Sequence, residues 1–241
     1  MSISQEITRI QNAKASLKTS INAKTDLQHQ ITDETIDDYA DFVDSITTGG
    51  SELPDGYTLV SYLESSKTQY INTGYVPNAN TKIEIKCLQI DGGGGLAFGT
   101  RQPAPGGGDD IYYSLATSSG KITFFYNQRI RLTSNFNTGD FIDLLVEKNK
   151  IAFNGVEYTG ININTFPTYP IVLFGLNNAG TMSLSSARIG RVKIYENNIL
   201  IRNFLPCYRN SDNVLGMYDV VNNVFYTNDG TGTFLYTPLY T

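Results

Sequence analysis

The chain has 241 residues, a formal net charge of −5 and no tryptophan, but 16 tyrosines, 12 phenylalanines and 22 glycines. This length permits one β-rich domain with a buried core plus a smaller segment. The acidic balance argues against a nucleic-acid-binding protein. No apolar run approaches the length of a membrane span, and no signal peptide is recognised. We therefore expect a protein that is made in a cytoplasm, is soluble or assembled there, and does not insert into a membrane.

Residues 1–48 are expected to be helical. Residues 2–24 contain no glycine or proline, and their apolar residues recur at heptad-like intervals, which predicts a seam for oligomerisation with one lysine inside it: Ile3, Ile7, Ile10, Lys14, Leu17 and Ile21. Isoleucine at both kinds of seam position favours a homotrimer. The alternative is an amphipathic helix that packs within its own subunit.

A second helix is expected between Ile36 and Ile46, with an acidic face that is typical of solvated surface. Residues 49–56 then form a glycine-containing hinge. Beyond the hinge, apolar residues recur at every second position. Strands are predicted at 57–63, 70–75, 81–90, 96–98, 111–115, 121–126, 129–133, 141–148, 150–153 and 170–176. Many short strands with regular turns predict a mostly β fold, an antiparallel sandwich over residues 57–241.

Two hairpins are expected near the C-terminus. Val192 and Ile194 alternate with Arg191 and Lys193, and the turn at 196–198 contains two asparagines, which tolerate positive φ. A second hairpin pairs 217–218 with 224–226 around a turn at 222–223.

This C-terminal stretch resembles the edge of concanavalin A-like (laminin-G-like) jelly-roll domains of bacteriophage fibre and tail proteins. The residues that carry the resemblance are 190–195 (GRVKIY), 204–209 (FLPCYR), 216–219 (GMYD) and 232–234 (GTF). The opening of the chain, ITRIQNAKASLKTSI followed by IDDYADFVDSI, is also similar to phage tail proteins. The resemblance implies a non-enzymatic virion structural protein, assembled in the host cytoplasm, whose N-terminal helices contact other virion proteins and whose jelly roll attaches to a host-surface glycan. A free-standing lectin-like protein is the alternative.

The residues favour a binding function over catalysis. The glucanases of this fold carry Glu-x-Asp-x-x-Glu on one strand; that string is absent, and Asp143 and Glu147 have the wrong spacing to replace it. One histidine and two cysteines leave zinc without a ligand set, and we assign no metal ligands and no cofactor. The resemblance leaves a calcium-assisted sugar site open, without a ligand set for it. Cys87 and Cys207 are expected to be reduced, with Cys87 in the core, although the sequence alone leaves their pairing open.

The most promising ligand site is the loop at 101–110 and the strand that follows it. It offers Arg101, Asp109 and Asp110, with Tyr112 beside them. An aromatic face next to charged hydrogen-bonding groups suits a sugar ring, which stacks its C–H face and bonds through its hydroxyls. The alternative is that these residues form an ordinary surface loop that binds no ligand. The glycine runs at 92–95 and 106–108 lack the Lys-Ser/Thr ending of a phosphate-binding loop.

Overall fold

The computed structural model describes residues 52–89, 93–103, 110–118, 121–125, 129–132, 141–159 and 163–238. The predicted helices of residues 1–48, their oligomerisation seam and Asp109 lie outside these residues, so those expectations stay predictions. In the described part of the chain there is no helix, and therefore none that crosses a membrane. Residues 55–237 form one compact unit.

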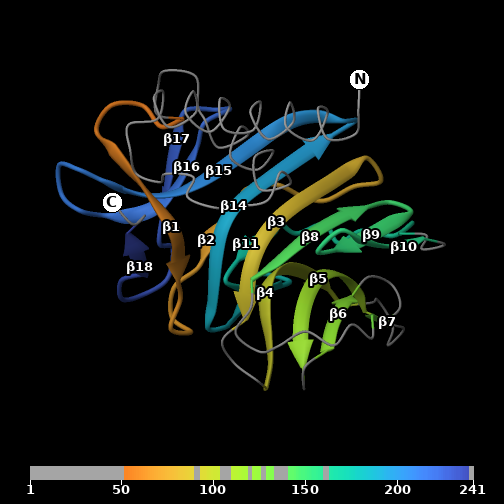
Figure 1. The fold of residues 1–241 in the computed structure, drawn as a ribbon. Coiled ribbons are helices and arrows are strands. Elements are labelled where there is room, and N and C mark those ends of the chain that lie inside the picture. The colour runs from red at the N-terminus through yellow and green to blue at the C-terminus, as the bar shows by residue number, and fades with distance from the viewer. Residues whose placement is uncertain are drawn as a thin grey trace, which may run out of the picture. The chain divides into compact units, whose positions relative to one another are not determined.

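Among the described residues, the larger of two sheets has ten strands (Figure 1). Its main path runs β10-β9-β8-β3-β14-β1-β15-β16-β17, and β18 pairs with β1. The bounds of these strands are β1 (Tyr57–Glu64), β3 (Thr81–Gln89), β8 (Ile142–Glu147), β9 (Lys150–Phe153), β10 (Val156–Thr159), β14 (Ala187–Glu196), β15 (Ile199–Arg209), β16 (Leu215–Asp219), β17 (Val224–Thr227) and β18 (Leu235–Pro238).

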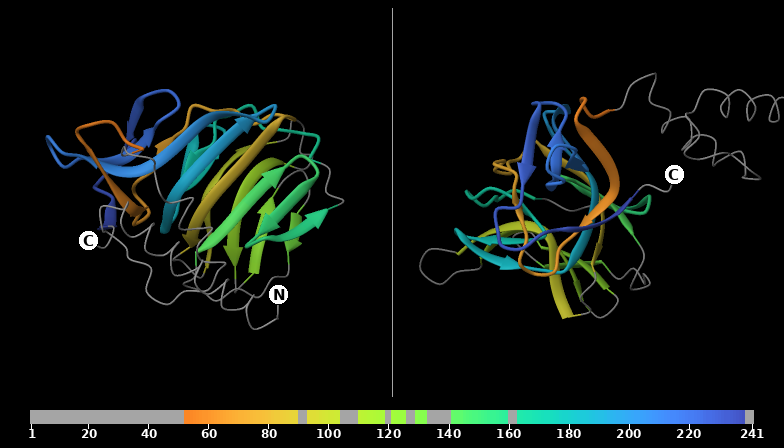
Figure 2. Two further views of the ribbon diagram at one scale, coloured as in Figure 1. Left: turned by 45° about the horizontal axis from the view of Figure 1, so that its top comes forward. Right: turned by 90° about the vertical axis from the view of Figure 1, so that its left-hand side faces the viewer.

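Eight described strands form the smaller sheet, in the order β13-β12-β4-β5-β6-β7, with β11 pairing to both β4 and β2. They are β2 (Ile71–Asn72), β4 (Gly93–Gln102), β5 (Ile111–Ser118), β6 (Lys121–Phe125), β7 (Arg129–Leu132), β11 (Val172–Leu173), β12 (Gly175–Asn178) and β13 (Thr181–Leu184). The two sheets appear as separate layers in Figure 2.

One apolar core lies between the sheets. Side chains alternate across each strand, so every second residue faces the other layer. The larger sheet contributes Ile83, Ile85 and Phe204, and the smaller sheet contributes Phe98 and Phe124, all of them no more than 2% exposed. The predicted mostly β fold with two packed sheets is thus confirmed for the described residues, whereas the jelly-roll assignment and the domain limits stay predictions.

The turn chemistry predicted from asparagine is also confirmed. Asn197 and Asn198, between β14 and β15, have φ of 53° and 63°, and Asn223, between β16 and β17, has φ of 57°. Both hairpins form with antiparallel registers. The left-handed conformation that these tight turns require is one that asparagine adopts more readily than most residues.

Four details differ from the sequence prediction. The strand expected at 70–75 is only two residues long, and the one expected at 170–176 is divided into β11 and β12 by Phe174, whose φ is 68°. Strands β10, β13 and β18 were not anticipated. The pairing of β12 with β4 is parallel, with Asn177 opposite Thr100, so the sheets are not wholly antiparallel.

Candidate functional site

The predicted sugar-binding residues Arg101 and Tyr112 are direct cross-strand partners in the ladder between β4 and β5. Paired residues of a ladder point to the same face of a sheet. Their neighbours Thr100 and Tyr113 form the next pair, and both are buried, because that pair faces the core. Arg101 and Tyr112 therefore lie on the opposite, outer face of the smaller sheet.

Asp110 completes a cluster with these two side chains. The Arg101 Nε donates to the Asp110 Oδ2 at 3.0 Å, and a second guanidinium nitrogen contacts the same oxygen. The guanidinium carbon lies 5.2 Å from the centre of the Tyr112 ring, and the Tyr112 hydroxyl is 3.5 Å from the Asp110 Oδ2. Arg101 and Asp110 each retain 27% of their side-chain exposure. The structure thus brings together three of the four predicted residues.

The framework that holds Arg101 is closely packed. Gly99 faces Ser114 one pair further along the ladder, where a Cβ on Gly99 would overlap the Cβ of Ser114. The carbonyl of Arg101 accepts a hydrogen bond from the Ala179 amide at 3.0 Å, which ties β4 to the turn after β12. The neighbouring Thr100 hydroxyl donates to the Tyr169 carbonyl at 2.9 Å. The backbone beneath the cluster is therefore fixed from both sides.

Chemically the cluster combines an aromatic ring, a guanidinium and a carboxylate in one half-exposed patch. Arginine supplies several directed donors, and a carboxylate supplies acceptors for hydroxyl groups. The ring face supplies an apolar surface for C–H groups. Glycoside hydrolysis requires two carboxylates across the bond, and Asp110 is the single carboxylate among these three residues. The geometry suits recognition of a polyhydroxylated ligand.

Cys87 and Cys207 are free and buried in the larger sheet, at 1% and 0% exposure. Burial raises the pKa of each thiol to about 12, and for Cys87 the charge of Asp143 adds to the rise. A nucleophilic cysteine needs a lowered pKa. The interpretation of Cys87 as a core residue is therefore confirmed.

Metal binding by the described residues has no evident site, because none of their histidine, cysteine, aspartate and glutamate side chains gather in groups of three or more that could hold an ion. The expectation that the protein is not an enzyme stays a prediction. Asp143 and Glu147 lie on β8, and Glu147 is 3.9 Å from both Lys82 and Lys150.

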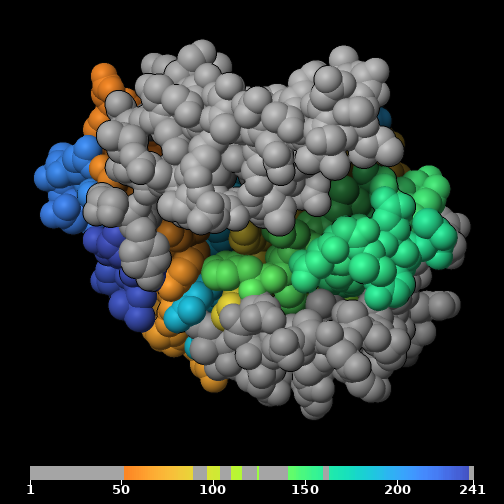
Figure 3. Space-filling view, viewed as in Figure 1, coloured from red at the N-terminus to blue at the C-terminus, as the bar shows by residue number. Residues whose placement is uncertain are grey.

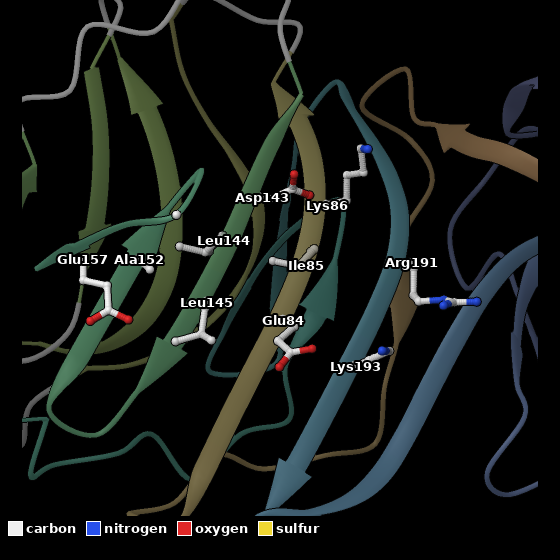
Figure 4. Close-up of a pocket in the computed structure, with 11 residues that line it drawn as sticks. Glu84, Ile85, Lys86, Asp143, Leu144, Leu145, Ala152, Glu157, Arg191 and Lys193 are labelled. Atoms are coloured by element: carbon white, nitrogen blue, oxygen red, sulfur yellow. The ribbon is translucent and has the colours of Figure 1, made fainter. Parts of the chain in front are cut away.

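A groove of about 490 Å³ on the outer face of the larger sheet was not found by sequence reasoning (Figure 4). Its floor is apolar or small: Leu145 on β8, Ala152 on β9, and Gly155 in the turn before β10. These residues belong to the segment that Figure 3 shows at the surface in green, residues 141–159. Three carboxylates, Glu84, Asp143 and Glu157, and three cations, Lys86, Arg191 and Lys193, surround this floor.

The ladder registers explain how remote segments build this groove. One row of paired residues crosses five strands in the order Glu157, Ala152, Leu145, Glu84, Lys193. The sequence neighbours of Ala152, Leu145, Glu84 and Lys193 are buried in the core, so these four residues point to the outer face, and Glu157 shares that face because it pairs with Ala152. The strand alternation of β3 and β14 was visible in the sequence, but the adjacency of β8, β3 and β14 was not.

The carboxylates of the groove are partly neutralised from outside it. Glu84 is 2.7 Å from the Lys82 ammonium and accepts a hydrogen bond from the Tyr195 hydroxyl at 3.2 Å. Glu157 is 3.0 Å from the Lys150 ammonium. The hydrogen bonds to Glu84 and Glu157 raise the pKa of Lys82 and of Lys150, respectively, above the ordinary lysine value.

Comparison with known proteins gives no family for this chain. No protein-family model matches the sequence, and no curated protein matches it. Among solved structures, a mutant of Trypanosoma rangeli sialidase that displays trans-sialidase activity is similar over 60% of this chain and 27% of its own, with 12% identity and a TM-score of 0.37. A native heptameric SAP-like pentraxin from Limulus polyphemus is similar over 77% of this chain and 96% of its own, with 8% identity and a TM-score of 0.42. Both similarities are remote, and neither assigns a function.

Proposed function

We propose that this protein is a non-enzymatic structural component of a bacteriophage virion, a fibre or appendage that attaches to a host-surface glycan through its β-sandwich. The observation that carries glycan attachment is the cluster of Arg101, Asp110 and Tyr112, which share one half-exposed patch of the smaller sheet. The virion part of the proposal is supported by the resemblance of both ends of the chain to phage proteins.

The glycan part is tested by screening the full-length chain on an array of bacterial surface glycans, with Tyr112→Ala beside it. We expect a bound glycan whose affinity falls by about 1–3 kcal/mol in the variant, the range for loss of an aromatic anchor. Tyr236→Ala is the matched control, because Tyr236 is 43% exposed and lies on β18, in the other sheet. If no glycan on the array is bound, or if Tyr236→Ala loses as much glycan affinity as Tyr112→Ala, the assignment of a glycan site at Tyr112 is contradicted.

We also propose that the protein is a homotrimer joined through residues 2–24, as their isoleucine-rich seam predicts. Ile10→Asp would place a charge in an apolar seam and is expected to convert trimers to monomers at micromolar concentration. Mass measurement in solution decides the point. A monomeric wild-type protein, or an Ile10→Asp variant that stays trimeric, would remove the seam from the proposal.

The lectin-like alternative shares the glycan site but not the virion role. Location and copy number of the protein in purified phage particles separate the two, because a free-standing lectin is absent from the particle. A protein found in no particle, yet active on the glycan array, would favour the alternative.

A further inference from the structure

We infer that the groove on the outer face of the larger sheet is a second ligand site, which binds an acidic polysaccharide whose sugar rings carry carboxylates. Its volume, about 490 Å³, lies within the range of small-molecule sites in proteins, roughly 300–1,000 Å³. The site is separate from the cluster at Arg101, which lies on the other sheet, so it does not depend on the function proposed for that cluster.

The cationic side of the groove provides the attraction for the acid. Lys86 on β3 and Lys193 on β14 line it together with Arg191, which lies at the bulge where β14 shifts its register against β3. Within the described residues, Lys86 and Lys193 stand outside the ion pairs that Lys82 and Lys150 form with Glu84, Glu147 and Glu157. Lys86 lies 6.0 Å from the Phe141 ring centre. The lining itself holds three carboxylates and three cations. Because Glu84 and Glu157 are paired with Lys82 and Lys150 outside the lining, Lys86 and Lys193 face Asp143 as the remaining carboxylate of the lining.

The rest of the groove selects for a sugar rather than for any anion. Glu84, Glu157 and Asp143 present acceptors to hydroxyl groups, and a ligand that carried acids alone would meet repulsion from them. Leu145 and Ala152 form a shallow apolar floor against which the C–H face of a ring can pack. A sugar ring with hydroxyls and a carboxylate matches the cations, the carboxylate acceptors and the apolar floor of the groove.

The location of the groove disfavours an extended peptide as its occupant. Strands β3 and β8 are paired on both sides within the sheet, so their backbone groups are already hydrogen-bonded. A peptide that adds to a sheet needs an unpaired strand edge. Recognition in this groove must therefore pass through side chains, as it does for saccharides.

Binding of the full-length protein to polygalacturonate by isothermal titration tests the inference, with dextran as the neutral polymer and poly-L-glutamate as the acid without sugar rings. We expect binding to polygalacturonate, no binding to dextran, and weaker binding to poly-L-glutamate. No binding to polygalacturonate overturns the inference, and so does equal or stronger binding to poly-L-glutamate, which would indicate an acidic peptide site.

Three variants locate the interaction. Lys193→Gln is expected to weaken polygalacturonate binding about tenfold, or about 1.4 kcal/mol. Lys148→Gln makes the same charge change on an exposed lysine outside the groove lining and is the matched control. Ala152→Gln fills the floor without changing charge and should also weaken binding. The groove is not the site if Lys193→Gln binds polygalacturonate as tightly as wild type, or if Lys148→Gln loses as much affinity as Lys193→Gln. Unchanged affinity in a folded Ala152→Gln variant would also exclude the groove.

Discussion

Two clusters of the same chemistry lie on the two sheets of this protein. In the smaller sheet, Arg101 stacks on Tyr112 at 5.2 Å and pairs with Asp110. In the larger sheet, Arg188 stacks on Tyr62 at 4.9 Å, and its Nε donates to Glu64 at 2.6 Å. Exposure does not separate them: the arginine and carboxylate are 27% and 27% exposed in one pair, 36% and 22% in the other.

Each cluster contains a pair of direct ladder partners, and the position of the carboxylate is what separates them. Arg188 and Glu64 are direct ladder partners, so their ion pair lies across the junction of β14 and β1. The Tyr62 hydroxyl shares a 2.6 Å hydrogen bond with Thr237 on β18, and its ring lies 5.5 Å from that of Phe141. Asp110 lies one residue before β5, outside the ladder, whereas Glu64 is the last residue of β1 and is paired within it. We therefore interpret the Tyr62 cluster as part of the scaffold and keep the Tyr112 cluster as the proposed ligand site.

The largest expected effect concerns the ladder that supports the Tyr112 cluster. Gly99→Ala should destabilise the fold by about 3 kcal/mol or more, because the new Cβ would overlap Ser114 and force β4 away from β5. Chemical denaturation provides the measurement. Gly190→Ala is the control, since its Cβ would meet nothing closer than 3.5 Å, and it should cost less than about 1 kcal/mol. An equal loss of unfolding free energy in Gly99→Ala and Gly190→Ala would contradict the close approach of β4 and β5.

The comparison of the clusters predicts different stability costs for the same truncation. Tyr62→Ala should lower the free energy of unfolding by about 2 kcal/mol, because it removes a hydrogen bond, a ring contact and the surface under Arg188. Tyr112→Ala should cost less than about 1 kcal/mol. Denaturation curves of the two variants measure the difference. If Tyr112→Ala were the more destabilising, the assignment of scaffold and site would have to be reversed.

A smaller effect comes from the thiols buried in the larger sheet. Their folded pKa of about 12 exceeds the ordinary value of 9.0, so the unfolded chain loses these protons first as pH rises. Stability should therefore be unaffected well below pH 9 and fall as pH rises through 9 toward 12, by about 1.4 kcal/mol per thiol at pH 10. Denaturation at pH 8 and pH 10 measures this loss. A Cys87→Ala/Cys207→Ala variant should show a smaller decrease than wild type, and an equal decrease would contradict the buried neutral thiols.

The sequence was informative where structure is local. Alternating residues predicted β3 and β8 closely, and asparagine turns predicted both C-terminal hairpins, because period and turn chemistry act over a few residues. The cluster of Arg101, Asp110 and Tyr112 was found for the same reason, since its residues lie within twelve positions of one another. The short edge strand β10 carries little periodic signal.

The sequence did not predict which strands pair with one another when they lie far apart in the chain. The groove is built from β3, β8, β9, β10 and β14, whose order in the sheet does not follow their order in the chain. Lys193 lies beside Glu84 although more than a hundred positions separate them in the sequence. The parallel pairing of β12 with β4 is equally invisible in residue patterns, because the alternation of a strand does not specify its neighbour.

The most direct test of the central claim is the affinity of wild type, Tyr112→Ala and Tyr62→Ala for the glycan that the wild-type protein selects from an array, each measured by isothermal titration on protein verified as folded. The account predicts that Tyr112→Ala loses about 1–3 kcal/mol of binding free energy, whereas Tyr62→Ala binds as wild type does. Unchanged binding by Tyr112→Ala, or a loss confined to Tyr62→Ala, would contradict it.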